Sequence, residues 1–187
     1  MKNRCSWADG SDIYRDYHDK EWGVPAYDDR ALFEAIILDT FQAGLSWLIV
    51  LKKRENFRAA FDDFDASKIA KYDDKKIKQL IEDKGIIRNK LKIYACVTNA
   101  QHFLRLQGEH GTFSRYIWQF VSGKPLINNW KDMSDMPATS KESDAMSKAL
   151  KGEGFKFVGS TICYAFMQAA GMINDHMVDC FRYKEVQ

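Results

Sequence analysis

Apolar residues recur along most of the chain at intervals of three and four, the spacing that places side chains on one face of an α-helix. This pattern predicts a helix that is capped by Asp28 or Asp29 and is interrupted at Gly44. A second helix is expected to follow Ser46 and to run through Phe61. The sequence has no sustained apolar–polar alternation, which would indicate half-buried strands, and only three prolines interrupt the 187 residues. The pattern therefore predicts an all-α fold.

The same periodicity predicts further helices in the rest of the chain. Asp65 and Asp73 are expected to cap two short helices, the second of which ends near Gly85. Residues 126–137 are the best candidate for a loop. The remaining helices are expected over residues 89–106, 113–121, 140–152, 158–170 and 174–181.

Composition narrows the class of protein. Hydrophobic residues make up 45% of the chain and charged residues 29%, the balance of an ordinary globular protein rather than a disordered one. The longest apolar-leaning segment, residues 161–173, is too short to span a bilayer and contains Gln168. The N-terminus has no apolar h-region, so we expect no secretory signal, a cytoplasmic location and four reduced cysteines.

Charge is nearly balanced overall but unevenly distributed. The formal net charge of +2 neither demands nor excludes a polyanionic partner. Bases outnumber acids over residues 52–58 and 75–92, whereas residues 62–74 are rich in aspartate. Such segregation fits either a basic binding face or an ordinary solvated surface.

The two ends of the chain carry residues that suit a metal site. Cys5 and His18 lie near the N-terminus, and His176 and Cys180 are spaced i, i+4 on a predicted helix near the C-terminus. Two cysteines and two histidines are the ligands of a closed structural zinc site, which here would tie the termini together. The alternative is that the four side chains are ordinary core residues, since the spacing from Cys5 to His18 is not that of a zinc finger.

Aromatic residues gather in the N-terminal third of the chain. They are Trp7, Tyr14, Tyr17, Trp22 and Trp47. Aromatic faces stack on an extruded nucleobase, and a nearby carboxylate, such as Asp39 or Glu21, accepts a hydrogen bond from its amino group. The alternative is that these rings fill the core.

A third candidate site lies between Leu80 and Lys92, where Gly85 separates two predicted helices. Basic residues follow this glycine at Arg88, Lys90 and Lys92. Backbone amides and cations in such a hairpin bind phosphates, although a single glycine between two helices is more often only a C-cap.

Six segments resemble the DNA-3-methyladenine glycosylase I family. They are YHDxEWGVP at residues 17–25, QAGLSW at 42–47, LKKREN at 51–56, GIIR at 85–88, GFKFVGxT at 154–161 and NDHxxxC at 174–180. With the two cysteines at either end, the resemblance runs in family order from Cys5 to Cys180. Several segments are long and unusual in composition, so the resemblance is specific.

The resemblance implies a helix-hairpin-helix glycosylase fold in one compact unit. Its hairpin core would span residues 36–130, and a zinc-bearing lobe would combine residues 1–35 with 138–187. The family's zinc implies one structural Zn²⁺ on Cys5, His18, His176 and Cys180. The implied base pocket comprises Tyr17, Trp22 and Trp47, with Trp7 close by, Glu21 as a further acidic candidate and Asp39 at the position of a family glutamate.

The resemblance also implies a DNA-binding surface. Gly44 and Leu45 match the turn that enters the duplex gap, and the hairpin role falls on residues 85–92, which include Gly85. The candidate phosphate contacts are Lys52, Lys53, Arg54, Arg88, Lys90 and Lys92, with Lys148, Lys151 and Lys156 as a second group.

The implied activity is hydrolysis of the N-glycosidic bond of 3-methyladenine in alkylated double-stranded DNA by a monomeric, monofunctional enzyme. Residues 101–113 contain no aspartate, in keeping with a family that acts only on labile cationic bases. Asp39 is shorter than glutamate by one methylene, about 1.5 Å, and either alters base recognition or is a tolerated variant. Two alternatives stay open: a zinc-stapled DNA-binding module, and a thiol redox protein, although the chain has no C-x-x-C motif.

Overall fold

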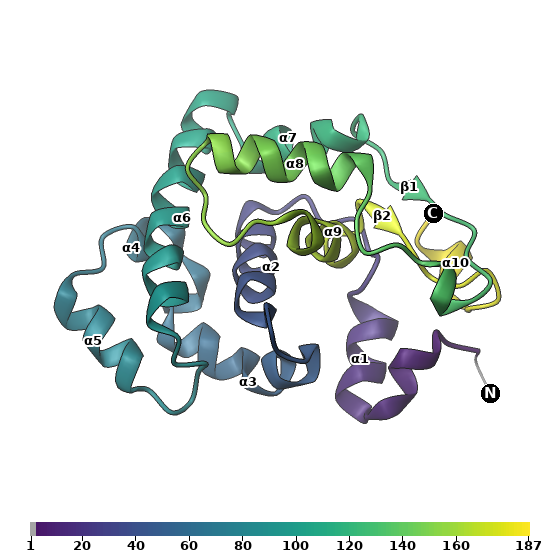
Figure 1. Ribbon diagram of the computed structural model, residues 1–187, viewed down its shortest axis with the longest axis horizontal. Coiled ribbons are helices and arrows are strands. Elements are labelled where there is room, and N and C mark those ends of the chain that lie inside the picture. The colour runs from purple at the N-terminus through teal and green to yellow at the C-terminus, as the bar shows by residue number, and fades with distance from the viewer. Residues whose placement is uncertain (1–2) are drawn as a thin grey trace.

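The computed structural model describes residues 3–187 and consists almost entirely of helices (Figure 1). The α-helices are α1 (Asp12–Lys20), α2 (Asp29–Gln42), α3 (Trp47–Ala60), α4 (Ala66–Ile69), α5 (Asp74–Glu82), α6 (Lys90–His110), α7 (Phe113–Trp118), α8 (Lys141–Gly152), α9 (Ser160–Ala169) and α10 (Arg182–Glu185). Short 3₁₀ helices cover Ser6–Gly10, Asp62–Phe64, Gln119–Val121 and Met133–Asp135. Two two-residue strands, β1 (Leu126–Ile127) and β2 (Ile173–Asn174), pair in parallel. The all-α prediction is confirmed for most of the described chain, and the two short strands are the exception.

Polar caps begin many of the helices at the predicted positions. The side chains that accept hydrogen bonds from the first helical turn include those of Asp28, Asp65, Asp73, Asn89 and Ser140. Helix α6 continues past its predicted end at Leu106 to His110, and Gly111, with φ of +85°, stops it there.

Helix α1 was not anticipated from the sequence. Its N-cap is Ser11, whose hydroxyl accepts a hydrogen bond from the amide of Tyr14 at 3.2 Å. Tyr14, Tyr17 and His18 recur at helical spacing, and the last two are buried. The signal for this helix is present in the sequence, in residues that recur at the helical period.

The helix predicted over residues 174–181 is wrong. After β2 the chain turns, and helical structure resumes only at α10. The Asn174 side chain accepts a hydrogen bond from the amide of His176 at 3.2 Å and donates one to the carbonyl of Tyr183 at 2.9 Å. These bonds replace the backbone pattern of a helix. His176 and Cys180 therefore do not share a helical face.

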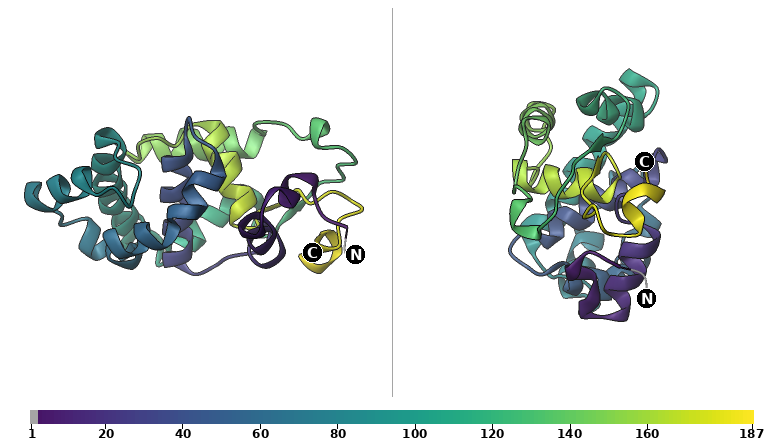
Figure 2. Two further views of the ribbon diagram at one scale, coloured as in Figure 1. Left: turned by 90° about the horizontal axis from the view of Figure 1, so that it is seen from below. Right: turned by 90° about the vertical axis from the view of Figure 1, so that its right-hand side faces the viewer.

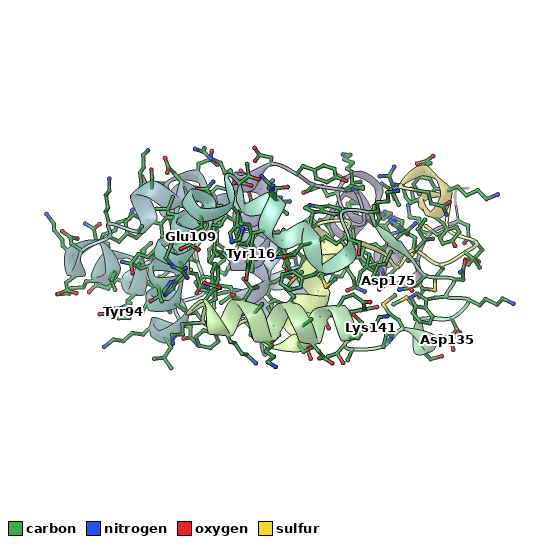
Figure 3. All side chains as sticks on the ribbon, turned by 90° about the horizontal axis from the view of Figure 1, so that it is seen from above. Tyr94, Glu109, Tyr116, Asp135, Lys141 and Asp175 are labelled. Atoms are coloured by element: carbon green, nitrogen blue, oxygen red, sulfur yellow. The ribbon has the colours of Figure 1, made fainter. Side chains whose placement is uncertain are left out.

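Asp175 holds this non-helical segment in place (Figure 3). Its carboxylate is fully buried and accepts hydrogen bonds from Asn128, Trp130, Tyr164 and Gln168 at 2.6–2.7 Å. A buried carboxylate with four donors is well satisfied, so the turn is fixed by side chains from distant parts of the chain.

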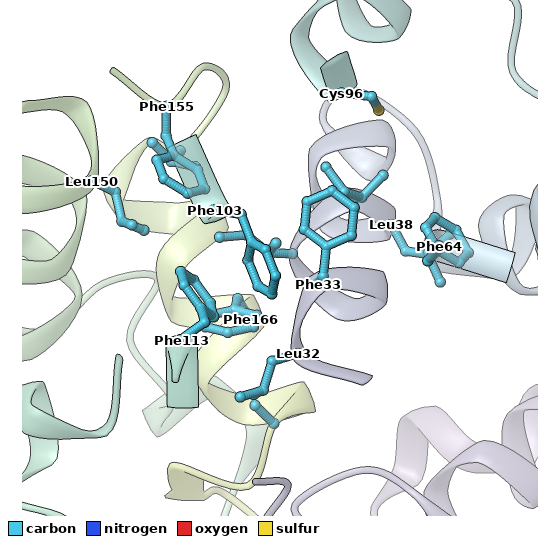
Figure 4. Close-up of a cluster of buried hydrophobic side chains, with 14 of the residues drawn as sticks. Leu32, Phe33, Leu38, Phe64, Cys96, Phe103, Phe113, Leu150, Phe155 and Phe166 are labelled. Carbon is cyan, nitrogen blue, oxygen red and sulfur yellow. The ribbon is translucent and has the colours of Figure 1, made fainter. Parts of the chain in front are cut away.

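Helix α2 runs through the middle of the molecule and contacts α3, α6, α7 and α9 (Figure 1). The main core around it is rich in phenylalanine, as Figure 4 shows for Phe33, Phe103, Phe113, Phe155 and Phe166. Because α2 is covered on most sides, its polar residue Asp39 is buried with its apolar ones. Burial of this helix is what places a carboxyl group inside the protein.

The N-terminal and C-terminal segments lie side by side at one end of the molecule (Figures 1 and 2). The amide of Phe181 donates a hydrogen bond to the carbonyl of Asn3 at 2.9 Å. A second apolar cluster joins the two ends and comprises Cys5, Tyr17, Trp22, Met177 and Cys180. Across residues 3–187, no helix is long and apolar enough to cross a membrane.

Candidate functional site

The structure brings Cys5, His18, His176 and Cys180 together in a buried cluster, called the Cys2His2 cluster below. Their ligand atoms all lie within 4.8 Å of one another. The Cys180 sulfur lies 3.4 Å from His18 Nε2 and 3.6 Å from His176 Nδ1, and the Cys5 sulfur lies 3.7 Å from His176 Nδ1. These four residues come from opposite ends of the chain, so the predicted convergence is confirmed although the predicted helix is not.

The donor set and its spacing fit a tetrahedral zinc ion. Zinc binds cysteine sulfur at about 2.3 Å and histidine nitrogen at about 2.05 Å, which gives sulfur–nitrogen edges of about 3.6 Å in a tetrahedron. Three sulfur–nitrogen distances in the cluster, 3.4, 3.6 and 3.7 Å, match that edge. The four side chains therefore offer the ligands of one metal site, and the 4.8 Å span of their ligand atoms would contract around a bound ion.

Neighbouring groups orient both histidine rings toward the cluster. Asp19 Oδ1 lies 2.8 Å from His18 Nδ1, and the carbonyl of Trp22 lies 3.0 Å from His176 Nε2. Each acceptor places the ring proton on the outer nitrogen and leaves the inner nitrogen free to ligate. Gly23 follows Trp22 with φ of +77°, and a Cβ there would lie 2.9 Å from His176 Nε2, so glycine permits this approach.

A cavity of 280 Å³ lies beside the Cys2His2 cluster and is called the aromatic cavity below. Its aromatic lining comprises Trp7, Tyr14, Tyr17, Trp22 and Trp47. The Tyr17 and Trp47 rings have centroids 5.4 Å apart, and those of Trp7 and Trp22 are 5.1 Å apart. The edge of Trp22 also packs on His176 at 4.6 Å, so the cluster supports one wall of the cavity.

Asp39 lines the aromatic cavity and is only 2% exposed. Its Oδ2 atom has no hydrogen-bond partner among the described residues. Burial raises the pKa of this carboxyl well above its ordinary range. The indole Nε1 of Trp47 is likewise buried without a hydrogen-bond partner among the described residues. Two unsatisfied polar groups thus belong to residues that line one cavity.

The N-terminal segment also fixes the start of α3. Ser46 occupies the N-cap position of α3 but makes no side-chain capping bond. Instead the Tyr14 hydroxyl accepts a hydrogen bond from the Leu48 amide at 3.0 Å. Helix α1 therefore caps α3 from outside and positions Trp47, the first residue of that helix.

Several predicted binding residues make other contacts. Glu21 does not line the aromatic cavity; its carboxylate pairs with Arg54 at 2.6 Å, and Arg54 also pairs with Glu34. The ammonium groups of Lys53 and Lys92 bind backbone carbonyls, Lys92 from a buried position and Lys53 from a partly exposed one. Exposed positions are retained by Lys52, Arg88, Lys90, Lys148, Lys151 and Lys156.

Six residues that line the cavity are not among the pocket residues predicted from the sequence. They are Gln42, Met133, Met136, Ala165, Gln168 and Ala169. The methionines lie in the segment predicted as a loop, which nothing in the local pattern connects to α2. Gln42 belongs to the QAGLSW segment of the resemblance, and Gln168 is the one amide side chain in the mostly apolar helix α9, which was a usable signal.

Comparison with known proteins agrees with this geometry. A family model described as methyladenine glycosylase matches residues 7–183. The chain belongs to the methyladenine glycosylase family. It is 48% identical over 180 residues to DNA-3-methyladenine glycosylase 1 of Escherichia coli (strain K12), and the match covers 96% of each chain. The predicted family resemblance is confirmed, and a glycosylase replaces the binding-module and redox alternatives.

Solved structures show the methyladenine glycosylase fold directly. A crystal structure of 3-methyladenine DNA glycosylase I superposes with a TM-score of 0.93 at 47% identity, covering 96% of this chain and 98% of that one. A second, at 36% identity and a TM-score of 0.92, covers 96% of both chains. That second structure is of a variant of 3-methyladenine DNA glycosylase I in complex with 3-methyladenine.

Proposed function

We propose that the chain hydrolyses the N-glycosidic bond of 3-methyladenine in alkylated double-stranded DNA, releases the base and leaves an abasic site. The observation that carries this proposal is the aromatic cavity with Asp39 buried in it and one carboxyl oxygen unsatisfied. A planar, cationic base with an amino group supplies both missing partners of such a site: a ring to stack and a charged donor to bond.

The chemistry of the substrate sets a modest catalytic demand. Alkylation at N3 makes adenine cationic, so the base leaves as a neutral molecule. The protein must extrude the nucleotide, exclude water and bind the cationic base. Stacking on Tyr17 and Trp47 supplies cation–π attraction of about 0.5–2 kcal/mol per ring.

Asp39 recognises the base by a charge that forms on binding. In the free protein, burial without a partner raises the pKa of Asp39 and favours the neutral acid. A cationic base in the cavity favours the carboxylate, which accepts a hydrogen bond from the exocyclic amino group while the proton leaves to solvent. A neutral adenine lacks this charge, so the same carboxyl group discriminates against undamaged bases.

The DNA is held by the turn between α2 and α3 and by the hairpin between α5 and α6. Leu45, 40% exposed in the turn between α2 and α3, enters the gap left by the extruded nucleotide. The segment between α5 and α6 forms the helix-hairpin-helix contact with phosphates, and the Gly85 amide within it is bonded to Asp83 Oδ1 at 2.7 Å. Arg88, Lys90 and Lys52 add cations, so affinity falls as salt rises.

The Cys2His2 cluster holds one structural Zn²⁺ in this proposal. Four protein ligands leave no open position, so the ion joins the termini and supports the cavity wall without touching substrate. No lysine is assigned to attack the sugar, so the enzyme is monofunctional and does not cut the strand. It acts as a monomer in the cytoplasm, where the four cysteines stay reduced.

A release assay on methylated duplex DNA tests the proposed function. The parent should release free 3-methyladenine, and Trp47→Ala should lower the single-turnover rate by about tenfold to hundredfold, because it removes a stack of about 1–3 kcal/mol. Its duplex affinity, measured by fluorescence anisotropy, should stay close to that of the parent. Equal losses in release and binding would make Trp47 a structural residue.

Asp39→Glu and Asp39→Asn complete the assay. Asn keeps the size of the side chain and removes its charge, so release should fall by about tenfold or more. Glu restores the longer acid of the family and should retain release. A parent that binds duplex and zinc but releases no base would overturn the proposed function.

A further inference from the structure

Lys92, the third residue of α6, has its ammonium group inside the protein. The residue is 5% exposed, and Nζ donates hydrogen bonds to the carbonyls of Phe41 at 2.9 Å and Ala43 at 2.6 Å. These carbonyls belong to the C-terminal end of α2, where backbone acceptors lack helical partners and the helix dipole favours a cation. Lys92 thus caps α2 immediately before the turn that carries Gly44 and Leu45.

Lys53 makes the reciprocal contact from α3. Its Nζ donates hydrogen bonds to the carbonyls of Lys84 at 2.9 Å and Gly85 at 3.0 Å. The side-chain amide of Asn56 also donates to the carbonyl of Gly85, at 3.2 Å. The hairpin before α6 is therefore held by α3, whereas the turn before α3 is held by α6. Lys53 joins α3 to the hairpin, and Lys92 joins α6 to the end of α2; the two residues are called the crossed lysine pair below.

The crossed lysine pair closes a ring of fixed contacts. The ring runs from the end of α2 through the Leu45 turn and α3 to Lys53, then through the hairpin and α6 to Lys92 and back to α2. Both ammonium groups are engaged by backbone carbonyls, Lys92 in the interior and Lys53 at a partly exposed position, so we assign both to holding the turn and the hairpin rather than to binding phosphate. Gly44 suits the turn because its φ is +81°, and no atom lies within 4 Å of the position a Cβ would take, so no neighbour packs directly on this glycine. The position of Leu45 therefore depends on the contacts on either side of the turn.

We propose that Lys92, assisted by Lys53, is a positioning residue that fixes the Leu45 turn relative to the phosphate-binding hairpin, so that docking of the hairpin on the backbone places Leu45 in the duplex gap. The inference rests on the proposed function, since it assigns the registration of that same DNA surface to the buried ammonium group of Lys92 and the partly exposed one of Lys53. Damage to the pair should impair insertion and excision more than it impairs binding.

Lys92→Met tests this role, because it keeps the aliphatic stem and removes the ammonium. The single-turnover release rate at saturating enzyme should fall by about tenfold or more, a loss set by two unpaired carbonyls. Duplex Kd should change by less than about twofold, and the dependence of log Kd on log salt should keep its slope. The comparison variant is Lys90→Met, two residues away and exposed, which should weaken Kd and lower the salt slope by about one unit.

A double-mutant cycle with Leu45→Ala separates positioning from a general structural effect. If Lys92 acts through Leu45, Lys92→Met should cost less than about threefold in the Leu45→Ala background, since coupled residues are not additive. A full-size loss in that background would overturn the proposal. A reduced salt slope with an unchanged release rate would do so too, because it would make Lys92 a phosphate ligand.

Lys53→Met and a reaction-free readout keep the test decisive. If Lys92→Met fails to fold, Lys53→Met on the partly exposed side should give the same pattern with a smaller loss. A duplex with 2-aminopurine next to an abasic analogue reports insertion by fluorescence without any release. If the parent releases no base but shows an insertion signal that Lys92→Met reduces, the proposed reaction is wrong and the positioning role of the crossed lysine pair stands. If the insertion signal is unchanged in both Lys92→Met and Lys53→Met, the positioning role is wrong.

Discussion

The Cys2His2 cluster and the aromatic cavity are neighbours that share Trp22, yet their polar groups are in opposite states. Each histidine in the cluster has one nitrogen facing a sulfur and the other facing a fixed acceptor. In the cavity, within the described part of the chain, Asp39 Oδ2 and Trp47 Nε1 are buried without any partner. The comparison separates a site that the chain completes from one that it leaves for a ligand.

The two states carry opposite consequences for stability. A satisfied ligand set that binds metal adds folding free energy, because the unfolded chain has no preformed site. A buried polar atom without a partner costs about 1–3 kcal/mol in the folded state. The cluster therefore adds stability to the fold beside a cavity whose unsatisfied polar groups lower it. This division fits a rigid site that is completed by an incoming base.

The largest effect is expected from Cys180→Ala, which removes one ligand of the cluster. The folded chain should lose its metal and more than about 4 kcal/mol of the free energy of unfolding. Urea unfolding and zinc content measure this directly. Cys96→Ala is the matched control, since Cys96 is equally buried but lies in the main core, and it should cost only about 1 kcal/mol. Similar losses in both variants, or a Cys180→Ala protein of parental stability without zinc, would contradict the metal role.

Gly23→Ala should have the next largest effect, because it moves a ligand without removing it. The new Cβ would lie 2.9 Å from His176 Nε2, in addition to the strain of a positive φ. We expect a loss of about 2–3 kcal/mol in unfolding free energy and weaker zinc retention against a chelator. Gly111→Ala carries the same strain with open space around it, and should cost about 1 kcal/mol with zinc retention unchanged. Equal chelator sensitivity in the two variants would show that the approach to His176 does not matter.

The cluster and the cavity also differ in how far the sequence could predict them. The identity of the four ligands depended on residue type, which is explicit in the sequence, and their convergence is confirmed. The helix predicted to carry His176 and Cys180 is wrong, because Asn174 and Asp175 satisfy their polar groups through other parts of the chain. The periodicity of apolar residues carries no information about such long-range hydrogen bonds.

For the cavity, the sequence supplied the aromatic residues and Asp39 but not the state of the carboxyl group. That state depends on α2 being covered on most sides and on no donor reaching Oδ2 within residues 3–187. In the same way, Lys92 is one base among several in the sequence, and only the packing of α6 on α2 turns it inward. Residue types were predictable; which charges are buried and what they touch depended on tertiary packing.

The smallest change in stability, and the sharpest test of the unsatisfied site, is expected from Asp39→Asn. Burial raises the pKa of Asp39 in the folded chain, so between its ordinary value of about 3.9 and the folded value the folded chain holds a proton that the unfolded chain releases. The contribution of Asp39 to stability therefore falls as pH rises, whereas asparagine does not titrate. The unfolding free energy of Asp39→Asn relative to the parent should increase from pH 5 to pH 8, measured in urea at each pH.

Over the same range, release of base by the parent should rise as Asp39 loses its proton, and release by Asp39→Asn should not change with pH. A stability difference that does not change with pH would mean that Asp39 is already ionised in the free protein. The cavity would then hold no neutral acid that loses its proton on binding, and its contrast with the satisfied Cys2His2 cluster would be wrong.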